Sequence, residues 1–258
     1  MITLAHISDL HVDGGSRARE RVEQVMAYLD AVADSVDALV VTGDLTENGT
    51  VGELEEARAL LSGRLPAVIC PGNHDVVEGR APFRRVMLGS EGGEKGDPGE
   101  APVNAVHRAD GGAVVLCDST VPSEDGGLLS EETLDWLEDT LADLRQTPVV
   151  LGFHHHPVKL HTPYVDHIAM QGADRLSVLL ARHPQVAGLL CGHAHTAAAT
   201  AFAQRPLLVA PGTVSVAPLP WEDAEQVYAA HPPALAFHIL DDEGRMTTHF
   251  RTAPAGRT

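Results

Sequence analysis

Short apolar runs alternate with longer amphipathic stretches along most of the chain. Six runs consist mainly of Val, Ile, Leu and Ala, as is typical of buried strands: they cover residues 2–7, 38–42, 67–70, 113–117, 149–153 and 187–191. Between the first two runs, Val22, Val25, Met26 and Leu29 recur at helical spacing. This alternation of strand and helix patterns predicts an α/β core with parallel strands.

Further patterns complete this picture. Ser130 opens a second helical stretch with a leucine stripe, and Leu176, Leu179 and Leu180 mark a third. After residue 197 the pattern becomes rich in strands, at 207–210, 234–240 and 246–252. We expect these late strands to complete the sheet as antiparallel pieces.

One stretch breaks the alternation. Residues 88–102 are rich in Gly, Glu and Pro and have no periodicity, so we expect a flexible loop there. A domain linker is the alternative, but the chemical motifs described below lie on both sides of this stretch. We therefore expect residues 1–258 to form a single domain, with a loose tail at 250–258.

Composition and charge narrow the possible partners. Hydrophobic residues make up 44% of the chain and charged residues 21%, which excludes a disordered chain. The formal net charge of −18 repels a polyphosphate backbone, so we expect no long nucleic acid as a partner. No apolar run reaches the roughly 18 residues of a membrane span, so we expect no membrane partner either.

The chain start and the cysteines bear on the compartment. The sequence begins directly with a strand pattern and lacks the basic segment of a signal peptide, which favours the cytoplasm. Cys70, Cys117 and Cys191 are odd in number, have no C-x-x-C spacing and each end an apolar run. We interpret them as reduced core residues.

Five of the apolar runs are followed by Asp, Asn or His. The five sequences are DLH at 9–11, GD at 43–44, PGNHD at 71–75, HHHP at 154–157 and GHAH at 192–195. In open α/β sheets, ligands bind at the carboxyl ends of the strands. We therefore expect these five segments to converge on one site.

The residue types in these segments indicate metal chemistry. Carboxylates mixed with imidazoles suit Mn, Fe or Zn rather than Ca or a thiolate-bound cluster. The candidate ligands, too many for one tetrahedral ion, are Asp9, His11, Asp44, Asn73, His155, His193 and His195. Two ions that share Asp44 would use all of them, at the roughly 3.5–4 Å separation of two-metal hydrolases. Two divalent ions with Asp9 and Asp44 leave a net charge of about +2, which attracts an anionic substrate.

The order D-x-H, G-D-x(4)-G, G-N-H-[DE], H-x-P and G-H-x-H resembles the calcineurin-like metallophosphoesterases. Residues 170–180 and 231–244 are similar to the branch of bacterial cyclic-nucleotide and glycerophosphodiester phosphodiesterases. The resemblance implies a four-layer αββα sandwich with two mixed β-sheets between the helices. It also suggests a homodimer.

The resemblance assigns the candidate residues to two metal ions. Asp9, His11, Asp44 and His195 would hold the first ion, and Asp44, Asn73, His155 and His193 would hold the second. The family's ligand stands two residues before the proline, which selects His155 from the three consecutive histidines; whether His154 or His156 supplements it stays open. His74 would bind no metal but would contact the phosphate, together with Asn73.

The mechanism that we expect is in-line hydrolysis. Both ions lower the pKa of a bridging water, and the resulting hydroxide attacks phosphorus. The metals and His74 stabilise the charge on the phosphoryl oxygens, and either His74 or a metal offsets the charge on the leaving oxygen. Asp44 and His74 are therefore the candidate catalytic residues.

A departure from the family pattern narrows the substrate. Protein phosphatases of this superfamily carry an arginine beside the closing glycine of the second motif, where it clamps a dianionic monoester; here Asn48 stands at that place. We therefore expect a small phosphodiester substrate, with cyclic nucleotides first. The alternatives are a phosphomonoesterase or a nuclease of the same superfamily, or a non-catalytic interaction scaffold that has lost its metals.

Overall fold

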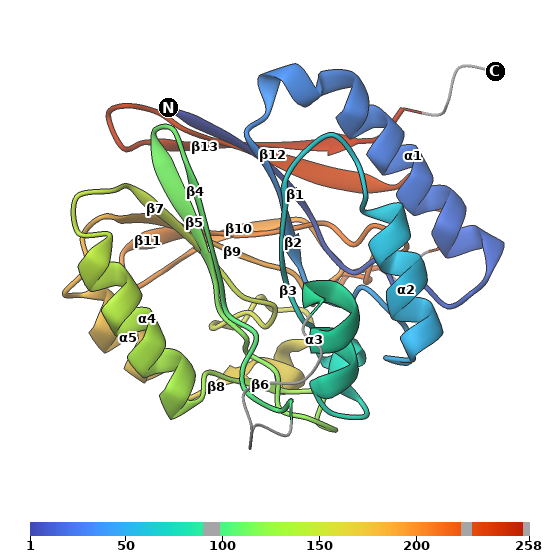
Figure 1. Cartoon of the computed structure of the whole chain (residues 1–258), viewed down its shortest axis with the longest axis horizontal. Coiled ribbons are helices and arrows are strands. Elements are labelled where there is room, and N and C mark those ends of the chain that lie inside the picture. Colours follow the sequence, from blue (N-terminus) through green and yellow to red (C-terminus); the bar gives the residue numbers. More distant parts are fainter. Residues whose placement is uncertain (90–98, 223–228, 255–258) are drawn as a thin grey trace.

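The computed structural model describes residues 1–89, 99–222 and 229–254 (Figure 1). Most of the expected loop at 88–102, namely residues 90–98, lies outside the described residues, and so do residues 255–258 of the expected tail. The first residues of that tail belong to a strand, which continues through Thr252. Ala253 then donates its backbone N–H to Pro233 O, so the described part of this segment is fixed to the sheet.

The first sheet has five strands in the order β13-β12-β1-β2-β3. Its parallel part consists of β1 (Ile2–Ile7), β2 (Ala38–Thr42) and β3 (Ala67–Cys70). The antiparallel strands β12 (Ala234–Leu240) and β13 (Met246–Thr252) extend it beside β1. The late strands at 234–240 and 246–252 are therefore antiparallel pieces that complete this sheet, as the sequence predicts. The same expectation for 207–210 is wrong, because residues 207–209 belong to a strand of the second sheet that runs parallel to one of its neighbours: the chain reverses direction at 198–202 and again before 205–209.

The second sheet has six strands in the order β10-β11-β9-β7-β5-β4. Four central strands are parallel: β5 (Gly112–Leu116), β7 (Val149–Gly152), β9 (Val186–Cys191) and β11 (Arg205–Val209). Antiparallel strands, β4 (Ala105–Ala109) and β10 (Ala198–Phe202), close the two edges. A separate short pair joins β6 (Gly127–Leu128) to β8 (Met170–Gln171).

Helices cover the outer face of each sheet (Figure 1). The first sheet is covered by α1 (Ser16–Val32), α2 (Val51–Leu60) and α3 (Ala81–Leu88). The second is covered by α4 (Glu131–Asp143) and α5 (Ala173–Leu180). The start of α4 follows from its sequence, because the Ser130 hydroxyl accepts the backbone N–H of Thr133 as an N-cap. Thr50 and Glu53 form a capping box that begins α2.

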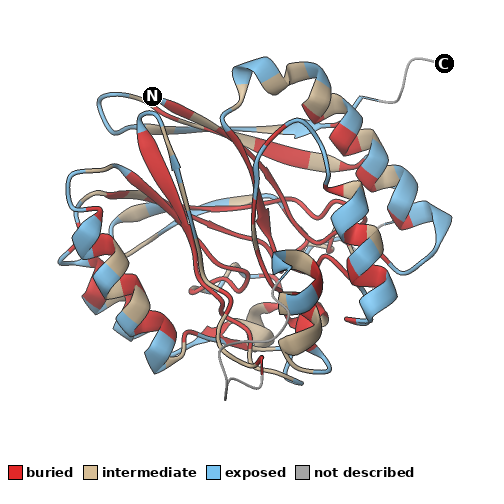
Figure 2. Cartoon of the chain, viewed as in Figure 1, coloured by how far each residue is buried: buried red, intermediate tan, exposed pale blue. Residues whose placement is uncertain are grey.

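Three apolar clusters separate these layers. One lies under α1, α2 and α3 and another under α4 and α5. The third joins residues of both sheets, among them Leu4 and Val40 from the first and Val114 and Leu190 from the second. Figure 2 shows the buried residues along the central strands and on the inner sides of the helices. The fold is therefore the four-layer αββα sandwich with two mixed sheets that the family resemblance implies. No helix in the described ranges is long and apolar enough to cross a membrane.

A buried pair of histidines lies in the first sheet. His6 Nδ1 is 3.0 Å from His238 Nε2, and the outer nitrogens bond the hydroxyls of Thr42 and Thr248 at 2.8 Å. Burial lowers the pKa of His238 to about 3 and holds the pKa of His6 well below its usual value. Both rings are therefore neutral in the folded protein at pH values where an unfolded chain protonates them.

This pair predicts an acid-sensitive fold. Below pH 6.5 the unfolded state binds more protons than the folded state, so the free energy of unfolding falls as the pH falls toward 3. Each histidine contributes a slope that approaches about 1.4 kcal/mol per pH unit. Urea unfolding of the metal-free wild type and of His238→Gln between pH 7.5 and 5 measures how the free energy of unfolding changes with pH. The variant should show the shallower slope, and equal slopes would contradict the assignment.

Candidate metal centre

The carboxyl ends of strands from both sheets meet at one edge of the sandwich. Backbone hydrogen bonds join the segments after β1 and β2, because Asp9 N–H donates to Gly43 O and His11 N–H donates to Asp44 O. The segments after β7 and β9 are joined by Gly192 N–H to His154 O at 3.0 Å. Asp9 connects the two sheets, since its Oδ1 accepts the backbone N–H of His193 at 3.0 Å.

The backbone at this edge takes a conformation that non-glycine residues rarely adopt. Five candidate residues have positive φ angles between 41° and 66°: Asp9, His11, Asp44, His193 and His195. Left-handed backbone in non-glycine residues costs energy and concentrates at functional sites. The regular extended backbone of each strand therefore ends at these residues.

A first group of donor atoms comes from Asp9, His11, Asp44 and His195. One ligand atom of each lies within 4.8 Å of one from every other. His11 Nε2 is 2.9 Å from His195 Nε2 and 3.7 Å from Asp44 Oδ2, and His195 Nε2 is 3.8 Å from Asp9 Oδ1. These four residues are the set that the resemblance assigns to the first ion.

A second group surrounds Nε2 of His154. This atom is 3.1 Å from His193 Nδ1, 3.2 Å from Asn73 Oδ1 and 3.3 Å from Asp44 Oδ2. Asp44 Oδ2 therefore lies against both donor groups, while its Oδ1 accepts the backbone N–H of His74 at 3.0 Å. Of the residues expected around the second ion, Asp44, Asn73 and His193 meet here.

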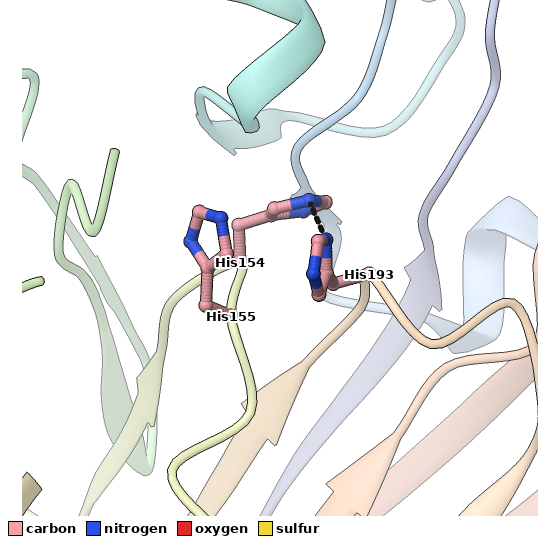
Figure 3. Close-up of side chains that lie close together, drawn as sticks. All are labelled: His154, His155 and His193. Carbon is pink, nitrogen blue, oxygen red and sulfur yellow. Dashed lines mark hydrogen bonds between the residues drawn. The ribbon is translucent and has the colours of Figure 1, made fainter. Parts of the chain in front are cut away.

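His155 lies beside this group: one of its ring nitrogens is within 4.8 Å of ligand nitrogens of His154 and His193, but its hydrogen bonds go elsewhere. Figure 3 shows the rings of His154, His155 and His193 together, with the hydrogen bond between His154 and His193 dashed. His155 Nε2 donates to Asp125 O at 3.2 Å, and its Nδ1 lies 2.9 Å from Ser119 Oγ. Because a carbonyl oxygen only accepts, the Nε2 carries the proton and the lone pair of Nδ1 faces the serine hydroxyl. Both ring nitrogens of His155 thus have partners outside the group.

His154 has the opposite arrangement. Its Nδ1 lies 2.6 Å from Thr42 O, so Nδ1 carries the proton and Nε2 turns a lone pair toward acceptor atoms. Burial opposes a charge on this ring, but Asp44 and Asp9 outweigh it and raise the pKa of His154 to about 9. The carboxylates of Asp44 and Asp9 thus favour a positive charge at Nε2 of His154, which either a proton or a metal ion supplies.

Two further features of these donor groups favour bound cations. Asp9 Oδ2 is buried without a hydrogen-bond partner among the described residues. His195 Nδ1 is 2.8 Å from Ser215 Oγ, and His11 Nδ1 is 2.8 Å from Glu47 Oε2. When both Nδ1 atoms donate to these oxygens, two Nε2 lone pairs face each other at 2.9 Å. A cation between them would remove that repulsion.

Several residues that support the site were not among the sequence candidates. Asp75 accepts hydrogen bonds from the backbone of Gly72, Leu45 and Thr46 and thereby joins the segments after β2 and β3. Ser119 and Ser215 follow β5 and β11, at the same edge as the predicted ligands. Ser119 follows the apolar run 113–117 within two residues, so the same signal that found the ligands would have found it. Ser215 lies six residues after β11, and the sequence carries no such signal for it.

Two glycines permit the close approach of these segments. A Cβ on Gly72 would lie 2.1 Å from Asp44 Oδ1, and one on Gly43 would lie 2.6 Å from His154 Nδ1. Gly43 also has φ +86°, which side chains disfavour. The glycines of the second and third motifs thus give Asp44 and His154 the space they occupy.

The sequence matches a known protein family over most of its length. Residues 2–197 match the model of the calcineurin-like phosphoesterases. The chain belongs to the calcineurin-like phosphoesterase family. It is therefore an enzyme that hydrolyses phosphoesters, and the family implies a dinuclear metal site for which the two donor groups are the candidates.

Bacterial members of this family are similar over most of the chain. The glycerophosphodiester phosphodiesterase GpdQ of Enterobacter lignolyticus is 30% identical over 91% of this chain and 86% of its own length. The 3′,5′-cyclic adenosine monophosphate phosphodiesterase CpdA of Escherichia coli is 33% identical over 74% of this chain and 67% of its own. These matches place the chain in the bacterial branch that the sequence resembles.

Solved structures show the same fold. A dimetal phosphatase from Danio rerio superposes with a TM-score of 0.70 over 98% of this chain and 96% of its own, at 17% identity. A purple acid phosphatase from yellow lupin has a TM-score of 0.66 at 13% identity and covers 98% of this chain and 51% of its own.

A cavity of about 860 Å³ opens over the donor groups of this calcineurin-like phosphoesterase. Asp44, Asn73, His193 and His195 line its floor together with His74, and the segment 163–168 contributes Tyr164 and His167 to its wall. His74 Nδ1 donates to Glu47 O at 2.7 Å, which leaves its Nε2 for a ligand. A small phosphoester has room in this cavity beside the donor groups.

Proposed function

We propose that this enzyme hydrolyses a small phosphodiester at two metal ions. Asp9, His11, Asp44 and His195 would hold the first ion, and Asp44, Asn73, His154 and His193 the second. This assignment keeps the predicted first group and replaces His155 by His154 in the second. The contacts of the two rings support the exchange, because the His154 Nε2 lone pair faces Asp44, Asn73 and His193 whereas both nitrogens of His155 bond elsewhere.

The position of Asp44 Oδ2 carries the proposal. It lies 3.7 Å from His11 Nε2 and 3.3 Å from His154 Nε2, so one carboxylate oxygen reaches both donor groups. The His154 ring lowers the pKa of Asp44 well below its usual value despite burial, so the carboxylate is ionised. Mixed carboxylate, amide and imidazole donors suit Mn, Fe or Zn.

Two bound cations would polarise the phosphoryl oxygens and lower the pKa of water for in-line attack. The side chains of this enzyme bind and orient the ester. Asn73 holds its amide oxygen toward His154 and lines the cavity floor. His74, fixed through Nδ1, presents Nε2 to the phosphate, where it can donate a proton to the leaving oxygen.

The surroundings of Asn48 support a diester rather than a monoester. Its side-chain amide donates to Glu53 Oε1 at 2.7 Å, at the start of α2, and it does not line the cavity. Arg17 is the one arginine or lysine among the described lining residues, and its Nη2 donates to the backbone oxygens of Val214 and Ala229. A second phosphate charge would therefore lack the arginine clamp of the phosphatases.

Cyclic nucleotides are the first candidates within this class. Relatives from Escherichia coli and Rhodococcus erythropolis are named as cyclic nucleotide phosphodiesterases, at 33% and 32% identity. Glycerophosphodiesters are the second candidates, because the relative named for them matches 91% of the chain. A cytoplasmic location and a homodimer stay predictions of the sequence.

Turnover of a substrate panel with added Mn tests this proposal. The panel contains 3′,5′- and 2′,3′-cyclic nucleotides, glycerophosphodiesters, and an aromatic phosphodiester beside its monoester. We expect the diesters to turn over, with a cyclic nucleotide best by kcat/KM. Hydrolysis of the monoester alone would favour a phosphomonoesterase, salt-sensitive DNA cleavage would favour a nuclease, and no metal and no turnover would favour a scaffold.

A further inference from the structure

Glu47 contacts two histidines of the site through different atoms. Its carboxylate Oε2 is 2.8 Å from Nδ1 of His11, and its backbone oxygen accepts Nδ1–H of His74 at 2.7 Å. The two rings meet edge to face with their centroids 4.7 Å apart. One residue thus fixes both a proposed metal ligand and the proposed proton donor.

The backbone of Glu47 is held firmly against the segment after β1. Its N–H donates to Val12 O at 3.0 Å, and Val12 N–H donates to Leu45 O at 2.9 Å. Val12 and Thr46 also form an isolated parallel bridge. The carboxylate therefore starts from a fixed point beside the His11 ring, although half of the Glu47 side chain remains exposed.

We propose that Glu47 is a positioning residue that holds His11 with Nδ1 protonated and Nε2 turned toward the first donor group. This inference rests on the proposed metal site. A carboxylate that accepts the second N–H of a ligand histidine fixes its tautomer and raises its basicity. Loss of such a partner typically lowers metal affinity 10- to 100-fold. His74 is held by the backbone oxygen instead, so a side-chain substitution at Glu47 leaves its tautomer in place.

Metal binding by Glu47→Ala and Glu47→Gln tests the role. Glu55→Ala is the matched control, because it removes the same charge from an exposed position on α2. Titration of Zn into the metal-free proteins by calorimetry gives a dissociation constant for each ion. We expect Glu47→Ala to weaken the binding of one ion about 10- to 100-fold and to leave the dissociation constant of the other unchanged. Glu47→Gln should lie between Ala and wild type, since its amide oxygen still accepts from Nδ1.

Nitrogen NMR of the imidazoles gives a second readout that a general loss of stability would not move. In the Zn-loaded wild type, the Nδ1 protons of His11 and His74 should both be protected from exchange. Glu47→Ala should remove that protection at His11 only.

Two results would count against the inference and are distinguishable. Wild-type constants for both ions in Glu47→Ala, with a protected His11 proton, would overturn the role of Glu47 alone. A wild-type chain that binds no ion would overturn the proposed function as well.

Discussion

Asp44→Ala is expected to lose both metal ions and at least about 10³-fold in kcat, because several kcal/mol of charge stabilisation depend on them. The Asp44 Oδ2 atom lies within 3.7 Å of both His11 Nε2 and His154 Nε2. Its Oδ1 also holds the backbone N–H of His74. Metal content after dialysis and turnover of the preferred diester with saturating Mn measure the loss.

A second substitution distinguishes the negative charge of Asp44 from its hydrogen bond with the backbone N–H of His74. Asp44→Asn can keep an oxygen toward the His74 N–H, while its amide group faces both donor groups without negative charge. We expect this variant to fold and still to lose both ions. Asp139→Ala, an exposed position on α4, is the matched control and should behave as wild type. Two bound ions and normal turnover in Asp44→Ala would contradict the two-metal site.

Substitutions among the three consecutive histidines are expected to have the second large effect, on metal content and turnover. His154→Ala should bind one ion fewer and lose about 100-fold or more in kcat, because Nε2 of His154 meets Asp44, Asn73 and His193. His155→Ala should keep both ions. Its expected cost is about 1–3 kcal/mol in the free energy of unfolding, because Ser119 Oγ and Asp125 O lose a buried partner.

Metal content and urea unfolding of the two variants distinguish the assignments. The same substitution at neighbouring positions serves as a mutual control, since both rings are fully buried. Loss of an ion from His155→Ala, with two ions retained by His154→Ala, would restore the assignment that follows from the spacing to Pro157.

The strands and most of the candidate residues could be predicted because both depend on local patterns. Runs of Val, Ile and Leu bury themselves as strands, and Asp9, Asp44 and His193 stand at the ends of such runs. Parallel strands bring their carboxyl ends to one edge of a sheet. The convergence of these segments on one site could therefore be predicted without knowing which residues far apart in the sequence are in contact.

The choice between His154 and His155 could not be made in this way. Adjacent side chains differ in direction according to the backbone of the loop, and that backbone is held by partners far away in sequence. Thr42 O, which fixes the His154 ring, lies 112 positions earlier in the chain. The role of Glu47 could not be predicted for the same reason, since its partner His11 lies 36 positions away.

The sequence by itself determined the α/β class, the order of the metal-binding motifs and the acidic surface, because these follow from local periodicity and composition. Only the tertiary structure decided how the strands divide between two sheets, which face each other across the cluster of Leu4, Val40, Val114 and Leu190. It also decided which nitrogen of each histidine faces the site. That depends on hydrogen bonds with Glu47, Ser215 and Thr42, whose partners lie far away in the sequence, and the bond between His154 and Thr42 forms only after the two sheets have packed.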